Sequence, residues 1–156
     1  MKRRTLATAL TAAAVGGILA IPTVSSAGHG GALTDGTFSG RAEVANGATN
    51  NRIVGDPNGG GEAYVFSTGG GVVCYVLEVD KIAPATAAHI HEAAAGANGP
   101  VVVNLTPPTN GSSAGCVDTG DQDLAADITL REPENYYVNV HNAEYPGGAV
   151  RAQLGN

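Results

Sequence analysis

The sequence predicts an all-β protein, an antiparallel β-sandwich or barrel that carries one short helix. Short segments rich in β-branched and aromatic residues recur along the chain, and Gly-, Asn- and Pro-rich segments separate them. Short strands at such close spacing are typical of sandwiches and barrels. The predicted strands cover residues 37–44, 62–67, 72–79, 87–91, 101–105, 136–142 and 149–154.

The connections are predicted from their turn-forming residues. Residues 45–61 (ANGATNNRIVGDPNGGG) and 106–115 (TPPTNGSSAG) are loops by composition. The tripeptide NGP at 98–100 opens one strand, and the turn YPGG at 145–148 joins the last two. The chain is therefore expected to reverse direction many times over short distances.

One segment, Asp121–Arg131, has the pattern of a helix. Thr119 or Gly120 is expected to cap it, and the acidic residues of its first turn suit the positive end of the helix dipole. Leu124 and Ile128, spaced i and i+4, are expected to pack on the sheet.

The first 27 residues have the pattern of a secretory signal peptide. A basic start (MKRR) precedes a mostly apolar stretch, residues 5–21, and small residues follow up to a cleavage point after Ala27. The stretch is short for a membrane span, which needs roughly 20 apolar residues, and no later segment qualifies. We expect a signal peptide at 1–27, a flexible leader at 28–36, and one secreted, extracellular domain at 37–156.

The exported chain is acidic and has no cluster of basic residues. Loss of three basic residues with the signal peptide changes the formal net charge from −6 to −9. Nucleic acid and anionic lipid both require clustered positive charge, so neither is an expected partner. An extracellular protein or another ligand is the expected partner, of unspecified identity.

Cys74 and Cys116 are the two cysteines of the chain. An even count in an exported protein indicates a disulfide, and no CxxC pairing supports the alternative of thiolate metal ligation. A disulfide over this span contributes about 4 kcal/mol in the chain-entropy model.

The segment AAHIHE places two histidines one residue apart on a predicted strand. Because side chains alternate across a strand, His89 and His91 share one face, and Ile90 takes the face that meets the core. Their Cα atoms are about 6.6–6.8 Å apart, which lets both rings reach one ion.

The segment YYVNVHN repeats this pattern on a later strand. Val138 and Val140 are expected in the core, which leaves Asn139 and His141 on the outer face. Imidazole suits copper and zinc, so a third histidine favours a metal site if the two strands are neighbours. The alternative is a set of surface histidines that bind nothing.

Three stretches carry a recognisable pattern: CYVLEVDKIAPATAAHIHEAAAGANGPVVVNLTPP, the later GCV, and the ending YYVNVHNAEYPGGAVRAQL. Together they resemble the CHRD domain family, named for chordin, an extracellular antagonist of bone morphogenetic proteins. The resemblance runs from about Thr37 to Leu154. It implies an immunoglobulin-like Greek-key β-sandwich in an extracellular setting, and it implies no established chemistry.

A looser resemblance connects the chain to copper–zinc superoxide dismutases, which also carry an HxH strand, a later Val-His and an arginine near the C-terminus. These features fall on His89, His91, His141 and Arg151. The resemblance implies a dismutase-like sandwich, copper held by the histidines, and Arg151 drawing an anion. Asn139, on the same outer face by strand alternation, is a candidate site-lining residue. The chain lacks a fourth copper histidine and a zinc-binding loop. The alternative for Arg151 is an exposed or snorkelling strand arginine paired with Glu144 or another acid.

Three functions follow in order of expectation. The first is a non-catalytic module that binds an extracellular partner through its loops. The second is a copper- or zinc-binding protein that uses His89, His91 and His141. A dismutase-like enzyme is the third.

Overall fold

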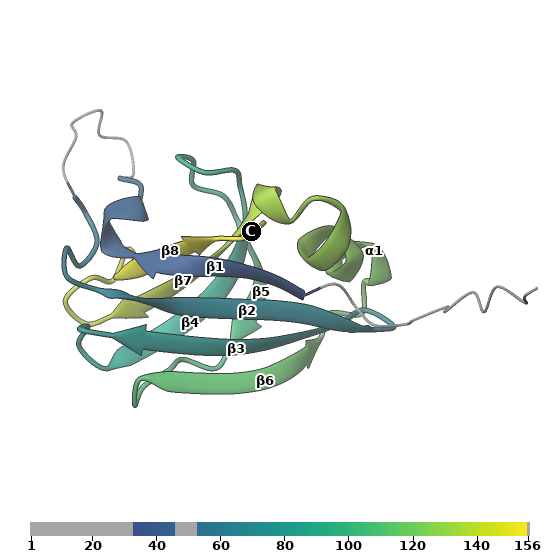
Figure 1. Cartoon of the computed structure of the whole chain (residues 1–156), viewed down its shortest axis with the longest axis horizontal. Helices are drawn as coiled ribbons and strands as arrows, with labels where there is room; N and C mark the ends of the chain where they lie inside the picture. The colour runs from purple at the N-terminus through teal and green to yellow at the C-terminus, as the bar shows by residue number, and fades with distance from the viewer. Residues whose placement is uncertain (1–32, 46–52, 156) are drawn as a thin grey trace, which may run out of the picture.

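The computed structural model describes residues 33–45 and 53–155 (Figure 1). In these residues eight strands form one antiparallel sheet in the order β5-β4-β7-β8-β1-β2-β3-β6. The strands are β1 (Leu33–Ser39), β2 (Gly60–Gly69), β3 (Val72–Asp80), β4 (Ala85–Glu92), β5 (Val101–Leu105), β6 (Ser112–Asp118), β7 (Tyr136–Asn142) and β8 (Val150–Gln153).

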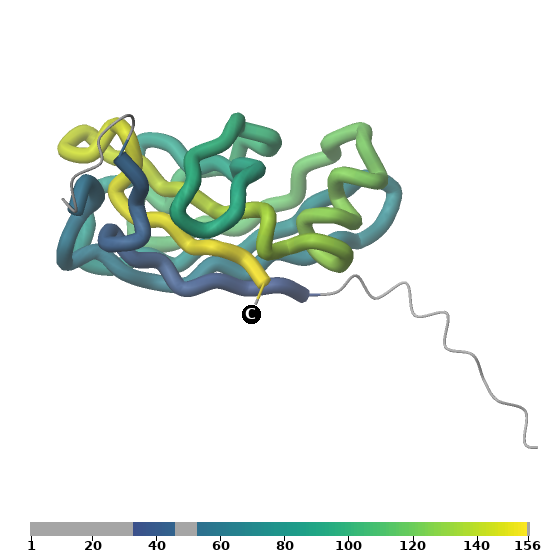
Figure 2. Tube along the Cα trace, turned by 90° about the horizontal axis from the view of Figure 1, so that it is seen from above, coloured from purple at the N-terminus to yellow at the C-terminus, as the bar shows by residue number. Residues whose placement is uncertain are grey.

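The sheet curls into two facing layers, with β1, β2, β3 and β6 in one layer and β4, β5, β7 and β8 in the other (Figures 1 and 2). Its two edge strands approach each other where Ser113 Oγ donates to the Thr106 carbonyl oxygen at 2.8 Å. Buried valine, leucine, isoleucine and alanine side chains fill the space between the layers. The predicted antiparallel sandwich or barrel is confirmed.

The first strand starts earlier than the sequence pattern indicated. The prediction was 37–44, whereas β1 spans Leu33–Ser39 and a 3-10 turn, η1 (Gly40–Ala42), follows it. The chain turns at Gly40, where a Cβ atom would lie 1.8 Å from the Asp56 carbonyl oxygen. Residues 33–36 of the expected leader are therefore part of the sheet. The rest of that leader and the predicted signal peptide lie outside the described residues.

Strand β6 was missed, because residues 112–115 were assigned to a loop. The strand is made of small and polar residues, and no residue in it is fully buried. Its partner is the strongly apolar β3, with Cys74 directly opposite Cys116. The predicted disulfide joins these two cysteines, which lie 42 positions apart in the sequence.

The predicted helix is present in a modified form. Its α-helical part, α1, covers Gln122–Ala126, and a π-helical turn, η2 (Asp127–Arg131), continues it before a short 3-10 turn, η3 (Pro133–Asn135). The N-cap is Asp121, whose carboxylate accepts from the backbone N–H groups of residues 123 and 124. The prediction of Thr119 or Gly120 as the cap was wrong, since a carboxylate at 121 reaches two free donors of the first turn.

No helix in residues 33–45 and 53–155 is long and apolar enough to span a bilayer.

Candidate metal centre

The strand pattern of β4 and β7 places the histidines on the face that points away from the core. Ile90 on β4 is fully buried, and so are Val138 and Val140 on β7. His89 and His91 alternate with Ile90, and each is half-buried. The predicted division of these residues between two faces is confirmed.

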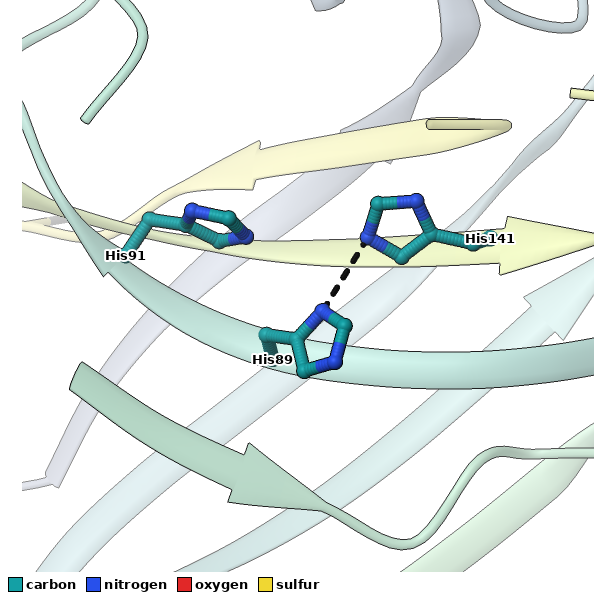
Figure 3. Close-up of side chains that lie close together, drawn as sticks. All are labelled: His89, His91 and His141. Atoms are coloured by element: carbon teal, nitrogen blue, oxygen red, sulfur yellow. Dashed lines mark hydrogen bonds between the residues drawn. The ribbon is translucent and has the colours of Figure 1, made fainter. Parts of the chain in front are cut away.

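The decisive feature is that β4 and β7 are neighbours. Their antiparallel register pairs His89 with Asn139, and it pairs His141 with Ala87, two positions from His89 on the same face. The ring centroids are 5.0 Å apart for His89 and His141 and 5.7 Å apart for His89 and His91. The pairing of two strands separated by more than 40 residues thus brings the three rings together (Figure 3).

One ring nitrogen of each histidine faces a common point. The three candidate ligand atoms all lie within 4.8 Å of one another. His89 Nδ1 and His141 Nε2 are 3.2 Å apart (Figure 3). The Nε2 atom of His91 is buried and has no hydrogen-bond partner among the described residues. A buried nitrogen without a partner is unusual in a folded protein and calls for a physical explanation.

The opposite nitrogens of two of these rings contact backbone carbonyl oxygens. His91 Nδ1 lies 3.0 Å from Gly99 O, and His141 Nδ1 lies 3.1 Å from Pro146 O. A carbonyl oxygen only accepts, so each Nδ1 carries the hydrogen and each Nε2 keeps its lone pair. Metal-binding histidines show this arrangement, because the second hydrogen bond fixes the tautomer and the ring orientation.

The environment keeps the three imidazoles neutral. Desolvation by burial lowers the pKa of His89, His91 and His141 below the ordinary value of 6.5, and the charges of neighbouring histidines lower those of His89 and His141 further. The hydrogen bonds to the Gly99 and Pro146 carbonyls oppose the shift for His91 and His141 respectively, and the charge of Arg151 adds to the shift for His91. Neutral imidazole is the form that binds a metal.

Arg151 lies on the same outer face but is not exposed. Its exposed fraction is 1 %, so the prediction of an exposed or snorkelling arginine was wrong, and in the described part of the chain Arg151 forms no ion pair within 4.0 Å with Glu144 or another acid. Nη1 donates to the Ala97 carbonyl oxygen at 2.7 Å, and Nη2 donates to Ala94 O at 3.1 Å and to Gln153 Oε1 at 2.8 Å. The segment between β4 and β5 covers the guanidinium, which sequence patterns could not indicate.

Tyr137 is a residue of this layer that the sequence analysis missed. Its ring stacks on that of His91, with centroids 4.8 Å apart and planes 7° from parallel. The Arg151 guanidinium carbon lies 3.4 Å from the centre of the same ring. Because β4 and β8 flank β7 on opposite sides, the Tyr137 ring lies between the imidazole and the guanidinium.

Asn139 is also buried, with an exposed fraction of 3 %, and it contacts a second residue that the sequence analysis missed, Glu43. Asn139 Nδ2 donates to Glu43 Oε2 at 3.0 Å. Neither Glu43 Oε1 nor Asn139 Oδ1 has a hydrogen-bond partner within the described ranges. Burial raises the pKa of Glu43 to about 7, although the hydrogen bond from Asn139 and the charge of Arg151 oppose the shift.

The fold and this cluster define a class of protein: an antiparallel β-barrel-like domain with a disulfide and three converging histidines on one layer. The model of the CHRD domain family matches residues 35–154. The chain belongs to the CHRD domain family, as the sequence resemblance indicated. No match was found among curated proteins or among solved structures.

Proposed function

We propose that this CHRD domain binds one copper or zinc ion through His89 Nδ1, His91 Nε2 and His141 Nε2. The observation that carries the proposal is the convergence of three neutral imidazole nitrogens within 4.8 Å of one another. In His91 and His141 the Nδ1–H group donates a hydrogen bond to a backbone carbonyl oxygen. This leaves the Nε2 lone pair of each ring free to bind a metal.

The spacing of one pair of these nitrogens already suits these metals. Metal–imidazole bonds of about 2.0–2.1 Å in tetrahedral geometry place two ligand nitrogens about 3.3 Å apart. His89 Nδ1 and His141 Nε2 already have this spacing, at 3.2 Å. In the metal-free protein the His89 Nδ1 hydrogen lies between them, because His141 Nε2 can only accept. A metal ion replaces that hydrogen, and His89 then carries its hydrogen on Nε2.

Three ligands leave a coordination position open. Zinc sites with three protein ligands keep their fourth position for water or an exogenous ligand. Copper(II) binds a given set of nitrogen ligands more tightly than zinc does, so we expect copper to win in direct competition.

The setting of this function is extracellular in our proposal. The Cys74–Cys116 disulfide and the basic, then apolar, N-terminal sequence support it. Binding of an extracellular partner, the first expectation from the sequence, stays a prediction, and it is compatible with a bound metal. No observation favours a dismutase, since the Arg151 donors contact backbone carbonyls and Gln153.

Metal stoichiometry tests the proposal. The exported chain is stripped of metal, loaded with copper(II) or zinc, desalted and analysed by mass spectrometry of the elements. We expect one ion per chain in the wild type, and none retained by His89→Ala or His141→Ala. His29→Ala is the matched control, because His29 is the one histidine outside the cluster. It should keep one ion per chain.

Two outcomes would contradict the proposal. One is a wild-type protein that retains no ion after loading with either metal. The other is loss of the ion in His29→Ala with retention in His141→Ala, which would place the metal at the N-terminus instead.

A further inference from the structure

We infer that Arg151 is a positioning residue for the metal centre, which orients His91 through the segment that joins β4 and β5. The inference rests on the proposed metal binding and identifies what holds one of its three ligands in place. In this role Arg151 orients a metal ligand and does not attract an anion.

Residues 93–100 form the segment that joins β4 and β5. It has no strand or helix of its own, and it lies over the outer face of the β4, β7 and β8 layer. Arg151 donates to the carbonyl oxygens of Ala94 and Ala97, and Gln153 Nε2 donates to that of Ala93 at 3.0 Å. Two adjacent outward side chains of β8 thus bind three carbonyl groups of this segment.

The same segment also contacts the proposed metal ligand His91. Gly99 O, in the same segment, accepts from His91 Nδ1, and Gly99 N donates to Tyr137 Oη at 3.4 Å. Gly99 packs closely against the end of β4, since a Cβ atom there would lie 1.8 Å from Glu92 O, so only glycine fits at this backbone position. The position of the Gly99 carbonyl therefore sets the tautomer and the orientation of the His91 ring.

Arg151 and His91 are also linked through the ring of Tyr137. The Tyr137 ring lies between His91 and Arg151, parallel to the imidazole and 3.4 Å from the guanidinium carbon. Arg151 thus acts on His91 from two directions, through the ring of Tyr137 and through the carbonyl of Gly99. The planar fork of arginine suits this arrangement, since it donates to several acceptors while it stacks on an aromatic face.

The charge of Arg151 does not explain its presence beside a metal site. A buried positive charge repels a second cation, and the structure gives it no carboxylate partner at hydrogen-bond distance among the described residues. On electrostatics alone, removal of this charge should strengthen metal binding. Weaker metal binding after removal of Arg151 would instead indicate that His91 is no longer held in its orientation. The two explanations therefore predict changes of opposite sign.

The test compares Arg151→Met and Arg151→Lys with the wild type. Arg131→Met is the matched control, because Arg131 is an exposed arginine on the helical segment paired with Asp123 and Asp127. We expect copper affinity to fall about 10- to 100-fold in both Arg151 variants, the usual effect of losing an outer-shell partner. Arg151→Lys should not restore affinity, since an ammonium keeps the charge but not the fork. Arg131→Met should bind as the wild type does.

A second measurement does not require metal. Long-range proton–nitrogen NMR of the metal-free protein reports which His91 nitrogen carries the hydrogen. We expect Nδ1–H alone in the wild type and in Arg131→Met, and a mixture of tautomers in Arg151→Lys. If Arg151→Met does not fold, copper affinity and the His91 tautomer are both measured on Arg151→Lys.

Unchanged copper affinity and an unchanged His91 tautomer in Arg151→Lys would overturn the inference, as would full recovery of affinity by lysine after a loss in Arg151→Met. A wild type that binds no metal but shows the expected tautomers would refute the proposed function and leave the positioning of His91 by Arg151 standing.

Discussion

At the scale of single residues, polar side chains on the outer face of the β4, β7 and β8 layer are buried. Asn139 and Arg151 are as inaccessible as core residues, although they point away from the core. Buried polar groups are normally paired, yet three atoms here have no partner in the described part of the chain: His91 Nε2, Asn139 Oδ1 and Glu43 Oε1. The proposed metal site would account for the first of them.

The other two atoms are explained if Glu43 carries a proton. Glu43 Oε2 accepts from Asn139 Nδ2, a hydrogen on Oε1 would make that atom a donor, and Asn139 Oδ1 is an acceptor without a partner among the described residues. The pKa of Glu43, raised to about 7, means that about half of these carboxyl groups carry a proton at pH 7. Gly148 leaves room for it, because a Cβ atom there would lie 2.5 Å from Glu43 Oε2.

A pH dependence of stability follows from Glu43. The pKa rises from 4.5 in the unfolded chain to about 7 in the fold, so between these values the folded state holds a proton that the unfolded state has lost. This group therefore lowers the free energy of unfolding as pH rises from 4.5 to 7, by about 3 kcal/mol in total. The loss is complete above pH 7.

Glu43→Gln tests this dependence. Glutamine does not titrate, and its amide can both accept from Asn139 and donate to it. In urea unfolding from pH 4.5 to 8.5, the variant should match the wild type at the acid end and be more stable above pH 7. A stability difference that is constant with pH would contradict a titrating Glu43.

At the scale of secondary-structure elements, strands that bury one apolar face were predictable and strand β6 was not. The limits of β5 and β7 agree with the prediction because Val103, Val138 and Val140 mark the buried face clearly. Residues 112–118 (SSAGCVD) contain no fully buried residue that would identify a buried face. Their position depends on pairing with β3 and on the disulfide, which are long-range features.

The disulfide should matter for stability and not for metal binding. It attaches the edge strand β6 to β3, in the layer opposite β4 and β7. We expect the double variant Cys74→Ala, Cys116→Ala to lose about 4 kcal/mol of unfolding free energy. It should still bind one copper ion at temperatures where it is folded. Chemical denaturation and metal analysis measure the two quantities, and reduced wild-type protein is the control. Loss of copper from the folded double variant would contradict the separation of the two sites.

At the scale of the whole molecule, the candidate site depends on one topological fact that the sequence could not supply. Alternation along each strand predicted that His89, His91 and His141 face outward. Whether β4 and β7 are adjacent depends on the fold of the whole chain, since 43 residues separate Glu92 from Tyr136. The burial of Arg151 was unpredictable for a related reason, because loop residues that lack any hydrophobic pattern cover it.

Metal binding at this position should stabilise the whole domain. The ligands come from two strands that the unfolded chain holds far apart, so the ion binds the folded state preferentially. Free metal at 100 times its dissociation constant then adds about 2.7 kcal/mol to the free energy of unfolding. Thermal unfolding should show a higher midpoint with copper in the wild type and no copper-dependent rise in His141→Ala. Equal rises in both proteins would show that the ion acts elsewhere.

The most direct test of the three-histidine site is a crystal structure of the copper-loaded protein with anomalous scattering recorded at the copper edge. We expect one strong anomalous peak about 2.0–2.1 Å from His89 Nδ1, His91 Nε2 and His141 Nε2, with the Gly99 and Pro146 carbonyl contacts retained. A peak bound by other residues, or three rings that keep their metal-free contacts with no peak between them, would contradict it.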